Sequence, residues 1–446
     1  MFKKVLIANR GEIAVRVIRA CRELGIKTVA VYSTADRSAL HAQIADEAVC
    51  IGGPAAKDSY LNYKAIIAAC EITGANAIHP GFGFLSENAT FARVCEKCGI
   101  TFIGPSPDSI DMLGDKAAAK AAMKAAGVPV IPGSDGAVPS MEEAFRLANE
   151  EIGYPLMVKA SAGGGGRGIR LVERSEDLER SIIEAKQEAK NFFGDDSIYM
   201  EKFIVDPKHI EFQILADKHG NVVHLGERDC SMQRRNQKVL EETPSTVMTD
   251  DLRRRMGEAA VNAAKVCGYY NAGTIEFLLD KSGEFYFMEM NTRIQVEHPI
   301  TELVTGIDLV KMQIKIADGQ ELPFTQDDIV MRGHAIECRI NAENPSQNFR
   351  PSPGEIRSLH TPGGPGIRID SSAYQGYVIT PYYDSMIAKL IAYAPTREEA
   401  IMKMKWALAE FIVDGVDTNI DFQLELIRDP VFEKGDYDIG YLGRRK

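Results

Sequence analysis

Apolar and polar positions follow a regular strand–helix–strand order in the first third of the chain. Residues 3–9 (KKVLIAN) and 27–33 (KTVAVYS) are short apolar runs typical of buried strands. Between them, residues 11–25 (GEIAVRVIRACRELG) carry apolar side chains at helical spacing. This order predicts a βαβ unit and a parallel sheet. The same pattern continues with strands at 48–52, 77–81 and 101–104 and with helices near 61–73 and 88–98.

Beyond the first third the pattern changes. An alanine-rich helix is expected at 117–127, and residues 211–217 and 222–229 read as two strands joined by the turn HGN, which is typical of antiparallel pairing. A long helix is expected at 396–411. The sequence thus predicts a multidomain α/β and α+β protein of 446 residues. Its expected domains are a parallel-sheet domain at 1–113, a central domain at 114–330 with a second unit at about 131–203 around the glycine stretch, and a mixed α+β domain at 331–446.

Residues 159–170 (KASAGGGGRGIR) place Gly163, Gly164, Gly165 and Gly166 in a row, at a high entropic cost. Apolar runs typical of strands stand on both sides, so the stretch matches neither a dinucleotide-binding turn nor a Walker A loop, and a flexible linker is disfavoured. Two interpretations remain open from the residues alone. The stretch is either an ordinary hairpin turn or a hairpin whose amides close over a phosphate.

Composition narrows the class of protein. The net charge of −11 argues against non-specific binding to nucleic acid or to an anionic membrane. The amino terminus lacks the long apolar core of a signal peptide, and no window approaches the ~20 apolar residues of a membrane helix. A cytoplasmic protein without nucleic-acid or membrane partners is therefore expected. Cys95 and Cys98 supply half of a zinc site at most, and helix packing is the favoured interpretation of both.

The richest chemistry lies in residues 273–299. Two apolar strands flank the turn DKSG, and pairing of Leu279 with Glu284 places Glu276, Glu289 and Asn291 on one face. Two carboxylates and an amide oxygen among apolar residues favour a Mg²⁺ or Mn²⁺ site over solvated glutamates. The inference depends on register, because a slip of one residue separates the two carboxylates.

Basic residues near this hairpin suggest a site for phosphate and a small anion. Lys116, Lys159 and Lys202 each follow an apolar run or a turn, and together with the glycines and the carboxylates they resemble a polyphosphate site. Arg234, Arg235 and Lys238 in ERDCSMQRRNQK, with Arg293 downstream, suit an anion such as bicarbonate, from which Glu297 could take a proton. A plain charged loop is the alternative for residues 227–235.

Seven motifs distributed over the whole chain resemble the biotin carboxylase subunit of bacterial acetyl-CoA carboxylase, an ATP-grasp enzyme. They are IANRGEIA, HPGFGFLSEN, GDK, KASAGGGGRGI, ERDCSMQRR, FMEMNTRIQVEHP and GHAIECRINAE. The resemblance implies carboxylation of biotin with ATP and bicarbonate through carboxyphosphate, as the first half-reaction of acetyl-CoA carboxylase in fatty acid synthesis. It also implies a homodimer that works with a separate biotin carboxyl carrier protein and with carboxyltransferase subunits. It further implies that the second unit at about 131–203 is a mobile lid.

The resemblance also implies roles for individual residues. Two Mg²⁺ or Mn²⁺ ions are expected, with Glu276, Glu289 and Asn291 as metal ligands. Bicarbonate would be held by Lys238, Arg293, Gln295, Val296 and Glu297, with Glu297 as the base. Arg339 would stabilise the biotin enolate, and Phe82 and Gly83 would line the biotin pocket. ATP would be held by the glycine loop (Gly163–Gly166), by the metal-binding Glu276 and Glu289, and by Lys116, Lys159, Glu201, Lys202, Phe203, Ile204, His209, Gln233, Asn236 and Leu278.

Two departures from the family pattern and several rivals stand beside this interpretation. Asn236 replaces a frequent histidine near the ribose, and Phe82 replaces a frequent tyrosine near biotin. The rivals are an ATP-grasp ligase with an amine acceptor, a non-catalytic nucleotide-binding regulator, and the biotin carboxylase subunit of a pyruvate or other acyl-CoA carboxylase. Met402-Lys403-Met404 matches the core of a biotin attachment motif, but the surrounding helical pattern predicts that Lys403 points to solvent on a helix and is not biotinylated.

Overall fold

The structure is a computed structural model that describes residues 1–160, 169–193 and 196–445. The chain forms two compact units, one made of residues 1–128, 208–277 and 289–446 and the other of residues 129–207 and 278–288. The glycine loop at 163–166 lies outside the described residues. Among the described residues, no helix combines the length and the apolar character that a membrane span requires.

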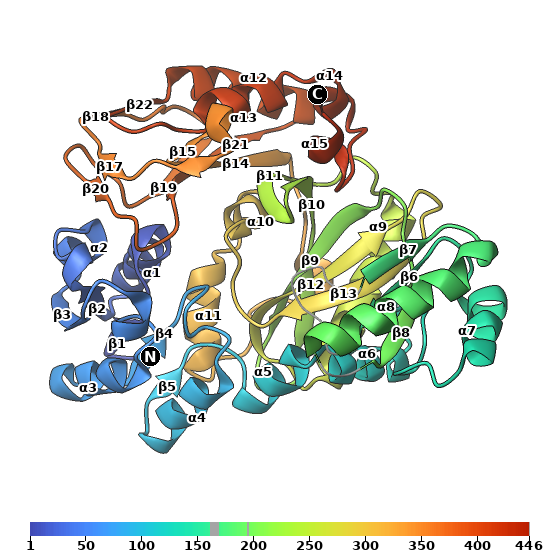
Figure 1. The fold of residues 1–446 in the computed structure, drawn as a ribbon. Helices are drawn as coiled ribbons and strands as arrows, with labels where there is room; N and C mark the ends of the chain where they lie inside the picture. Colours follow the sequence, from blue (N-terminus) through green and yellow to red (C-terminus); the bar gives the residue numbers. More distant parts are fainter. Residues whose placement is uncertain (161–168, 194–195, 446) are drawn as a thin grey trace. The chain divides into compact units, whose positions relative to one another are not determined.

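The predicted parallel sheet opens the larger unit (Figure 1). Its strand order is β3-β2-β1-β4-β5, with parallel pairing throughout. The strands are β1 (Lys4–Ile7), β2 (Lys27–Ser33), β3 (Glu47–Gly52), β4 (Ala77–His79) and β5 (Thr101–Phe102). The helices are α1 (Gly11–Glu23), α2 (Leu40–Ile44), α3 (Tyr63–Thr73), α4 (Ala89–Lys97) and α5 (Pro107–Gly114).

Helices cover both faces of this sheet, because side chains alternate along each strand. Val5 and Ile7 of β1 belong to a core that includes the apolar side of α1, whereas Leu6 belongs to a second core with α3 and α4. Cys95 is buried in that second core, as predicted. Cys98 is exposed just beyond α4, so its assignment to helix packing was wrong.

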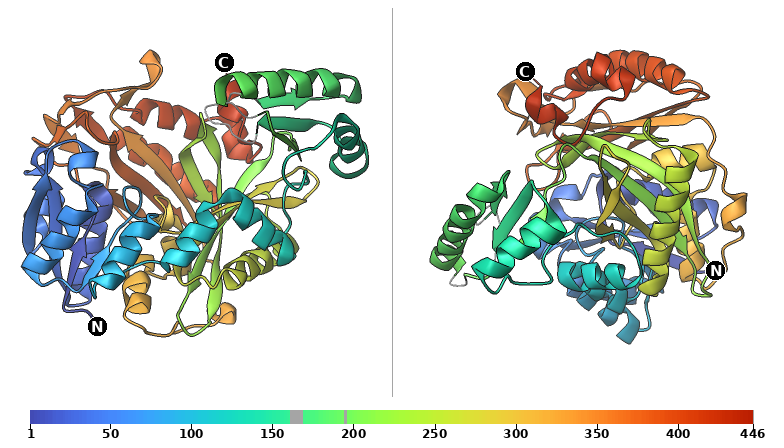
Figure 2. Two further views of the ribbon diagram at one scale, coloured as in Figure 1. Left: turned by 60° about the horizontal axis from the view of Figure 1, so that its bottom comes forward. Right: turned by 90° about the vertical axis from the view of Figure 1, so that its right-hand side faces the viewer.

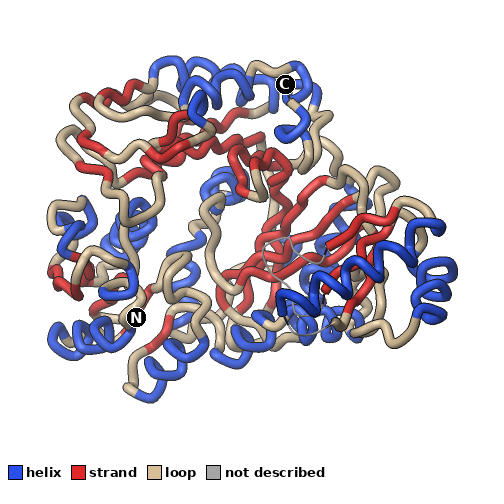
Figure 3. The backbone as a smooth tube through the Cα atoms, in the orientation of Figure 1, coloured by secondary structure: helices blue, strands red, loops and turns tan. Residues whose placement is uncertain are grey.

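A long sheet has the strand order β13-β12-β9-β10-β11-β14-β21-β19. Strands are drawn in red in Figure 3. Its strands are β9 (Lys208–Ala216), β10 (Val222–Arg234), β11 (Gln237–Thr243), β12 (Asn271–Leu279), β13 (Phe285–Asn291), β14 (His334–Asn341), β19 (Ile367–Ser371) and β21 (Met386–Ala394). β9 and β10 pair antiparallel, as predicted. Residues from the expected central and C-terminal domains therefore share one sheet, joined where β11 pairs with β14.

The faces of β14 and β21 differ sharply. Ile336, Cys338 and Leu390 point into a core that α12 (Arg397–Glu410) and α13 (Ile420–Ile427) complete, and Figure 2 shows the red helices of this region beside the orange strands. Glu337, Arg339 and Lys389 alternate with those apolar residues, so they lie on the opposite face. Small ladders complete this region: β15 (Glu343–Asn344) with β16 (Arg350–Pro351), β17 (Gly354–Glu355) with β20 (Val378–Ile379), and β18 (Ser358–His360) with β22 (Ile412–Asp414).

Further helices belong to the larger unit. They are α6 (Lys116–Ala125), α9 (Asp250–Val266), α10 (His298–Thr305), α11 (Leu309–Ala317), α14 (Pro430–Lys434) and α15 (Tyr441–Arg444). Ile401, Met404 and Leu408 of α12 are buried in the core, as predicted. Lys403 does not point freely into solvent, because its Nζ donates to the carbonyl oxygen of Pro365 at 2.9 Å.

The smaller unit holds the strands that flank the glycine loop. β6 (Leu156–Ala160) pairs antiparallel with β7 (Ile169–Val172) and with β8 (Ile198–Lys202), and α7 (Met141–Leu147) and α8 (Leu178–Phe193) pack on them. The two predicted strands on either side of the glycine stretch are thereby confirmed. Phe287 in the hairpin end donates its amide to the carbonyl oxygen of Pro129, which ties residues 278–288 to this unit.

Candidate active site

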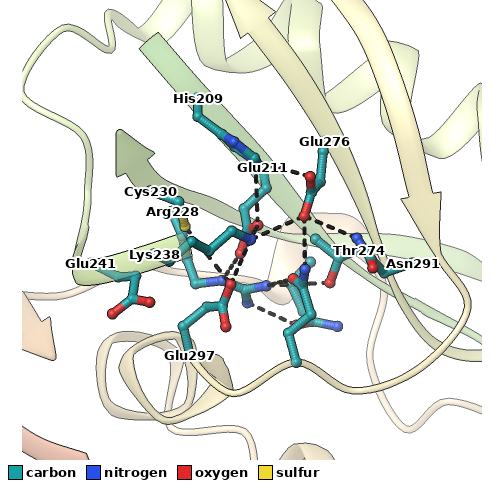
Figure 4. A network of polar contacts seen from close by, with 12 residues as sticks. His209, Glu211, Arg228, Cys230, Lys238, Glu241, Thr274, Glu276, Asn291 and Glu297 are labelled. Atoms are coloured by element: carbon teal, nitrogen blue, oxygen red, sulfur yellow. Dashed lines mark hydrogen bonds and ion pairs between the residues drawn. The ribbon is translucent and has the colours of Figure 1, made fainter. Parts of the chain in front are cut away.

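A cluster of buried charges lies on one face of the long sheet (Figure 4). Arg228 of β10 stands directly opposite Glu211 of β9 in the antiparallel register, and the guanidinium donates to Glu211 Oε1 at 2.5 Å. Both side chains are fully buried. A buried ion pair of this kind is costly to desolvate and is retained only when further hydrogen bonds compensate it. Here the guanidinium also donates to Gln213, Thr301, Thr274 and Gln295.

Lys238 of β11 lies at the centre of the cluster. Its Nζ donates to Glu211 Oε2 at 2.6 Å, to Glu297 Oε1 at 2.7 Å and to Glu276 Oε1 at 3.0 Å. Burial alone would lower the pKa of this ammonium, but the three carboxylates together raise it well above its ordinary value. A permanent positive charge is therefore fixed among carboxylates from three different segments of the chain.

Glu276 of β12 collects donors from several elements. Its Oε1 accepts from Lys238, from Asn291 Nδ2 at 2.9 Å and from Gln295 Nε2 at 2.8 Å, and its Oε2 lies 3.1 Å from His209 Nε2. Burial would raise the pKa of Glu276, but Lys238 and His209 hold it well below its ordinary value. The carboxylate is thus ionised and available to a cation.

The hairpin that carries this carboxylate closes one residue later than predicted. The Asp280 amide donates to the carbonyl oxygen of Glu284, so the loop comprises residues 281–283, with Gly283 at φ +86°. Such a left-handed position favours glycine. That register alone would separate Glu276 from Asn291, yet their side chains are hydrogen-bonded. The burial alternation of β13 breaks at residues 288–289, both half-buried.

The residues predicted to hold metal offer oxygen donors of the type that Mg²⁺ prefers. Glu276 is ionised, Glu289 lies half-buried two residues before Asn291 in β13, and Asn291 Oδ1 accepts from Arg293 at 3.0 Å. Glu211 and His209 place ligand atoms within 4.8 Å of one another and of Glu276, so the ligand environment is richer in potential donors than the sequence suggested. The donor set therefore fits a hard divalent cation.

Glu297 occupies the end of the segment that precedes α10. Its Oε1 faces Lys238, its Oε2 accepts from Arg339 at 3.0 Å, and the Cys230 thiol lies 3.9 Å from Oε1. Burial would raise the pKa of Glu297, but Lys238, Arg339 and Arg228 together lower it well below its ordinary value. An ionised carboxylate between two cations is the form that a proton acceptor requires.

Arg339 reaches this carboxylate from β14. Its Nε donates to Glu241 Oε1 at 2.7 Å, and Glu241 is fully buried in β11. Arg339 and Lys238 also line a small cavity of the larger unit. The other residues around that cavity are Arg234, Gln237, Val239, Asn341, Glu343, Phe349 and Asn419. Two cations of the cluster are therefore accessible from one hollow.

Arg234 and Arg235 do not join the cluster, contrary to the suggestion that they hold the anion. Both donate to Asn348, and the Arg234 guanidinium stacks on the Phe349 ring at 3.8 Å. The alternative of a plain charged loop at residues 227–235 is wrong, because most of this stretch belongs to strand β10, whose residues 223–233 are buried apart from the half-buried His224. Only the two-residue turn Arg235–Asn236 projects, with both residues at positive φ, a conformation that asparagine tolerates well.

Arg293 and the loop of residues 82–87 lie together in the larger unit. Arg293 Nε donates to Glu87 Oε2 at 2.9 Å, and the Thr292 amide donates to Glu87 Oε1. Asn9 Nδ2 donates to the carbonyl oxygen of Phe82 at 2.7 Å. The exposed Gly83 follows with φ +68°. The predicted biotin-pocket loop is therefore tied to the predicted bicarbonate segment.

The residues predicted to hold ATP are divided between the two units. In the larger unit, Gln233 Nε2 lies 2.8 Å from His209 Nδ1, and Asn236 is exposed. In the smaller unit, Lys159 Nζ contacts Glu201 directly. The same unit contains Lys202, Phe203, the buried Ile204 and the half-buried Leu278. Lys116 is the first residue of α6.

Sequence reasoning missed three buried charged residues: Glu211, Arg228 and Glu241. Glu211 alternates with Phe212 in a run taken as an ordinary strand, and Arg228 likewise lies in the predicted strand 222–229, where no special role was given to it. The available signal was alternation itself, because His209, Glu211 and Gln213 place polar groups on every second position between apolar residues.

Models of three protein families match successive parts of the chain. Residues 1–110 match "Biotin carboxylase, N-terminal domain", residues 115–325 match "Carbamoyl-phosphate synthase L chain, ATP binding domain", and residues 337–444 match "Biotin carboxylase C-terminal domain". Biotin carboxylase 1 of Bacillus subtilis is 58% identical over 443 residues, which are 99% of this chain and 98% of that protein. The chain belongs to the biotin carboxylase family. It is an ATP-dependent ligase that carboxylates biotin, and its parallel N-terminal sheet, ATP-grasp centre and antiparallel C-terminal region form the fold that the sequence predicted.

Relatives from other carboxylases are almost as similar. One subunit of the pyruvate carboxylase of Methanothermobacter thermautotrophicus is 56% identical over 436 residues, covering 98% of this chain and 88% of that protein. The solved biotin carboxylase domain of Hydrogenobacter thermophilus 2-oxoglutarate carboxylase is 54% identical, with a TM-score of 0.89 and coverage of 99% and 97% of the two chains. That domain is a dimer in complex with MgADP, ADP and bicarbonate.

Proposed function

We propose that the Lys238 cluster is the bicarbonate site of this biotin carboxylase, with Glu297 as the base of the first half-reaction. The observation that supports the proposal is the Lys238 ammonium, which lies 2.7 Å from Glu297 and 3.0 Å from Glu276. Bicarbonate would accept hydrogen bonds from the side chains of Lys238, Arg293 and Gln295 and from the Val296 main chain. A fixed cation beside a carboxylate base suits an anion that must lose a proton while it attacks.

Glu276, Glu289 and Asn291 would hold Mg²⁺ or Mn²⁺, expected as two ions, on the phosphates of ATP. The ions would neutralise charge on the transferring phosphoryl group. ATP itself would be held by Lys116, Lys159, Glu201, Lys202, Phe203, Ile204, His209, Gln233, Asn236, Leu278 and the glycines 163–166. These ATP assignments rest on the family resemblance, because the residues belong to both units and include positions outside the described residues.

The proposed reaction proceeds in two steps. Glu297 takes the bicarbonate proton while a bicarbonate oxygen attacks the γ-phosphorus, so that ADP leaves and carboxyphosphate forms. Carboxyphosphate then breaks into CO₂ and phosphate, the phosphate takes the N1′ proton of biotin, and the resulting enolate attacks CO₂. Arg339 would hold the enolate oxygen, and Phe82 and Gly83 would border the biotin ring.

The proposed biological setting is the first half-reaction of acetyl-CoA carboxylase in fatty acid synthesis, carried out in the cytoplasm. Biotin would arrive on a separate carrier protein, the chain would form a homodimer, and carboxyltransferase subunits would take the product. The resemblance of the seven motifs to the subunit of bacterial acetyl-CoA carboxylase supports this setting. A pyruvate or 2-oxoglutarate carboxylase is the second candidate, because relatives from both are similar over nearly the full chain.

The experiment that tests the site assignment is ADP release in buffer depleted of bicarbonate. We expect ADP formation to depend on added bicarbonate and to accelerate with free biotin, and we expect Glu297→Gln to lose the bicarbonate-dependent part. Unchanged ADP release without bicarbonate would refute the assignment. Affinity capture of the partner that carries biotin, followed by identification of its associated carboxyltransferase, separates the two biological settings.

A further inference from the structure

Lys389 of β21 is a fully buried lysine that contacts the proposed bicarbonate segment through the main chain. Its Nζ donates to the carbonyl oxygen of Val296 at 2.9 Å. The same ammonium lies 3.1 Å from Glu12 Oε1 and 3.8 Å from Asp370 Oδ2. Three segments distant in the sequence, namely the first turn of α1, strand β19 and the loop before α10, therefore converge on one cation.

The position of Lys389 is unfavourable for a residue that serves only to pack the sheet. In the β14–β21 ladder it stands directly opposite Arg339, and like charges that oppose each other across a ladder are destabilising. Asp370 stands opposite Lys389 on its other side, in β19. Burying an ammonium is costly, and an apolar side chain of similar volume is often no less stable at such a position. The hydrogen bond to the Val296 carbonyl oxygen offers a functional explanation for this buried charge.

The carbonyl that Lys389 holds belongs to the peptide that joins Val296 to Glu297. The preceding carbonyl, that of Gln295, is held by His298 Nδ1 at 2.8 Å. Glu297 is the N-cap residue of α10, yet its side chain makes no capping hydrogen bond and faces Lys238 and Arg339 instead. The direction of that side chain therefore depends on how its main chain is fixed, and Lys389 fixes it from the sheet.

We propose that Lys389 is a positioning residue for the bicarbonate half-reaction, because its ammonium, held by Glu12 and Asp370, fixes the Val296–Glu297 peptide and thereby the Glu297 carboxylate. The inference rests on the proposed role of Glu297 and adds the group that orients it. Lys389 touches no reacting atom. It keeps the Glu297 carboxylate in the geometry at which proton transfer and attack coincide. Small displacements from that geometry lower the reaction rate strongly.

Glu12 is the acidic partner of Lys389 from a different part of the fold. It is buried in the first turn of α1, and among the described residues neither of its carboxylate oxygens has a hydrogen-bond partner. In the part of the chain that the structure describes, the Lys389 ammonium is the one cation that forms an ion pair with Glu12. Glu12→Gln therefore weakens the ion pair with Lys389 but still allows the contact between Lys389 and Val296. Its effect should be smaller than the effect of removing the lysine.

The test compares Lys389→Met with a matched control in steady-state ADP release with bicarbonate and free biotin. The control is Arg253→Met, which strips the buried Glu227 of its cation on α9 and touches no residue of the site. Thermal unfolding measures the loss of stability in each. We expect Lys389→Met to lower kcat about tenfold or more and to raise the KM for bicarbonate, with the KM for MgATP changed less than about twofold. Arg253→Met should lower Tm with both KM values unchanged.

A second measurement reads the peptide directly. In protein labelled with ¹⁵N-glutamate, the amide signal of Glu297 should shift in Lys389→Met and shift less in Glu12→Gln, and it should stay in place in Arg253→Met. If Lys389→Met does not fold, Glu12→Gln carries the same test, with a smaller rise in the bicarbonate KM. Two results would overturn the role of Lys389 alone, provided that the unsubstituted enzyme shows normal bicarbonate dependence. They are an unmoved Glu297 signal and an unchanged bicarbonate KM in Lys389→Met. ADP release independent of bicarbonate in the unsubstituted enzyme would overturn the site assignment and this role together.

Discussion

Arg339 and Glu297 are in direct contact, with the guanidinium 3.0 Å from Oε2 of the carboxylate. The residue proposed to stabilise the biotin enolate in the second step thus also supports the base proposed for the first. Glu241 Oε1 contacts both Nε and Nη2 of the same guanidinium. If both proposed roles hold, one ion pair couples the two half-reactions, and this affects how substitutions at Arg339 will appear in assays.

Arg339→Ser should damage biotin carboxylation far more than bicarbonate-dependent ATP cleavage, because the enolate forms only in the second step. Cleavage itself should fall moderately and should show an acidic limb at higher pH than in the unsubstituted enzyme. The reason is that loss of a cation raises the pKa of Glu297, so the base is protonated at a higher pH. The measurement is the pH profile of both assays. Equal losses in the two assays would contradict the division of roles.

Glu289→Gln should abolish turnover while the fold persists. One carboxylate removed from the metal ligands takes away charge stabilisation worth roughly several kcal/mol at the transferring phosphoryl group. Glu284→Gln, on the exposed end of the same hairpin, is the matched control and should keep its activity. Turnover is measured over a range of Mg²⁺ concentrations together with circular dichroism. Near-normal turnover of Glu289→Gln at ordinary Mg²⁺ would remove this residue from the ligand set.

Acid should unfold the protein partly through Glu242. Burial alone would raise the pKa of this carboxylate. Hydrogen bonds from His334 and Arg397 outweigh that effect and lower the pKa to about 2. Because the folded pKa lies below the unfolded one, the stabilisation is present above the unfolded value, which lies at about 4.3, and is lost as the pH falls toward 2. The contribution is about 3 kcal/mol.

The check for Glu242 is chemical unfolding between pH 6 and pH 3. Glu242→Gln should be less stable at neutral pH and should show a shallower decline with acid. Glu71→Gln, on the exposed side of α3, should keep the slope of the unsubstituted protein. An unaltered slope in Glu242→Gln would mean that other carboxylates govern acid unfolding.

Lys403 should carry no biotin. Although it stands between two methionines, it lies inside α12 and donates to the Pro365 carbonyl, whereas biotin attachment lysines sit at the tip of a β-hairpin in the carrier domains that the motif resembles. Chain co-expressed with an active biotin ligase should give no streptavidin signal and no biotin mass shift. A carrier protein expressed in the same cells provides the positive control. A stoichiometric shift on Lys403 would refute the separate-carrier proposal.

Local patterns in the sequence were sufficient for most elements and for the family. Strand and helix periodicity predicted β1, α1 and β2 and their parallel pairing, because each pattern repeats over a few neighbouring residues. The resemblance of seven motifs to a known family likewise predicted the membership in the biotin carboxylase family, whereas the roles of Glu276, Lys238 and Glu297 stay predictions. These inferences need only the order of residues along the chain.

Tertiary structure decided what lies beside those residues. The closing pair Asp280–Glu284, the break in β13 and the pairing of β11 with β14 depend on turn geometry and on contacts between distant segments, which no local pattern contains. Glu211, Arg228 and Lys389 read as ordinary charges in the sequence. Only the folded sheet shows that they are buried and paired. A charge is costly once its environment excludes water, so a buried charge points to a specific role in the protein.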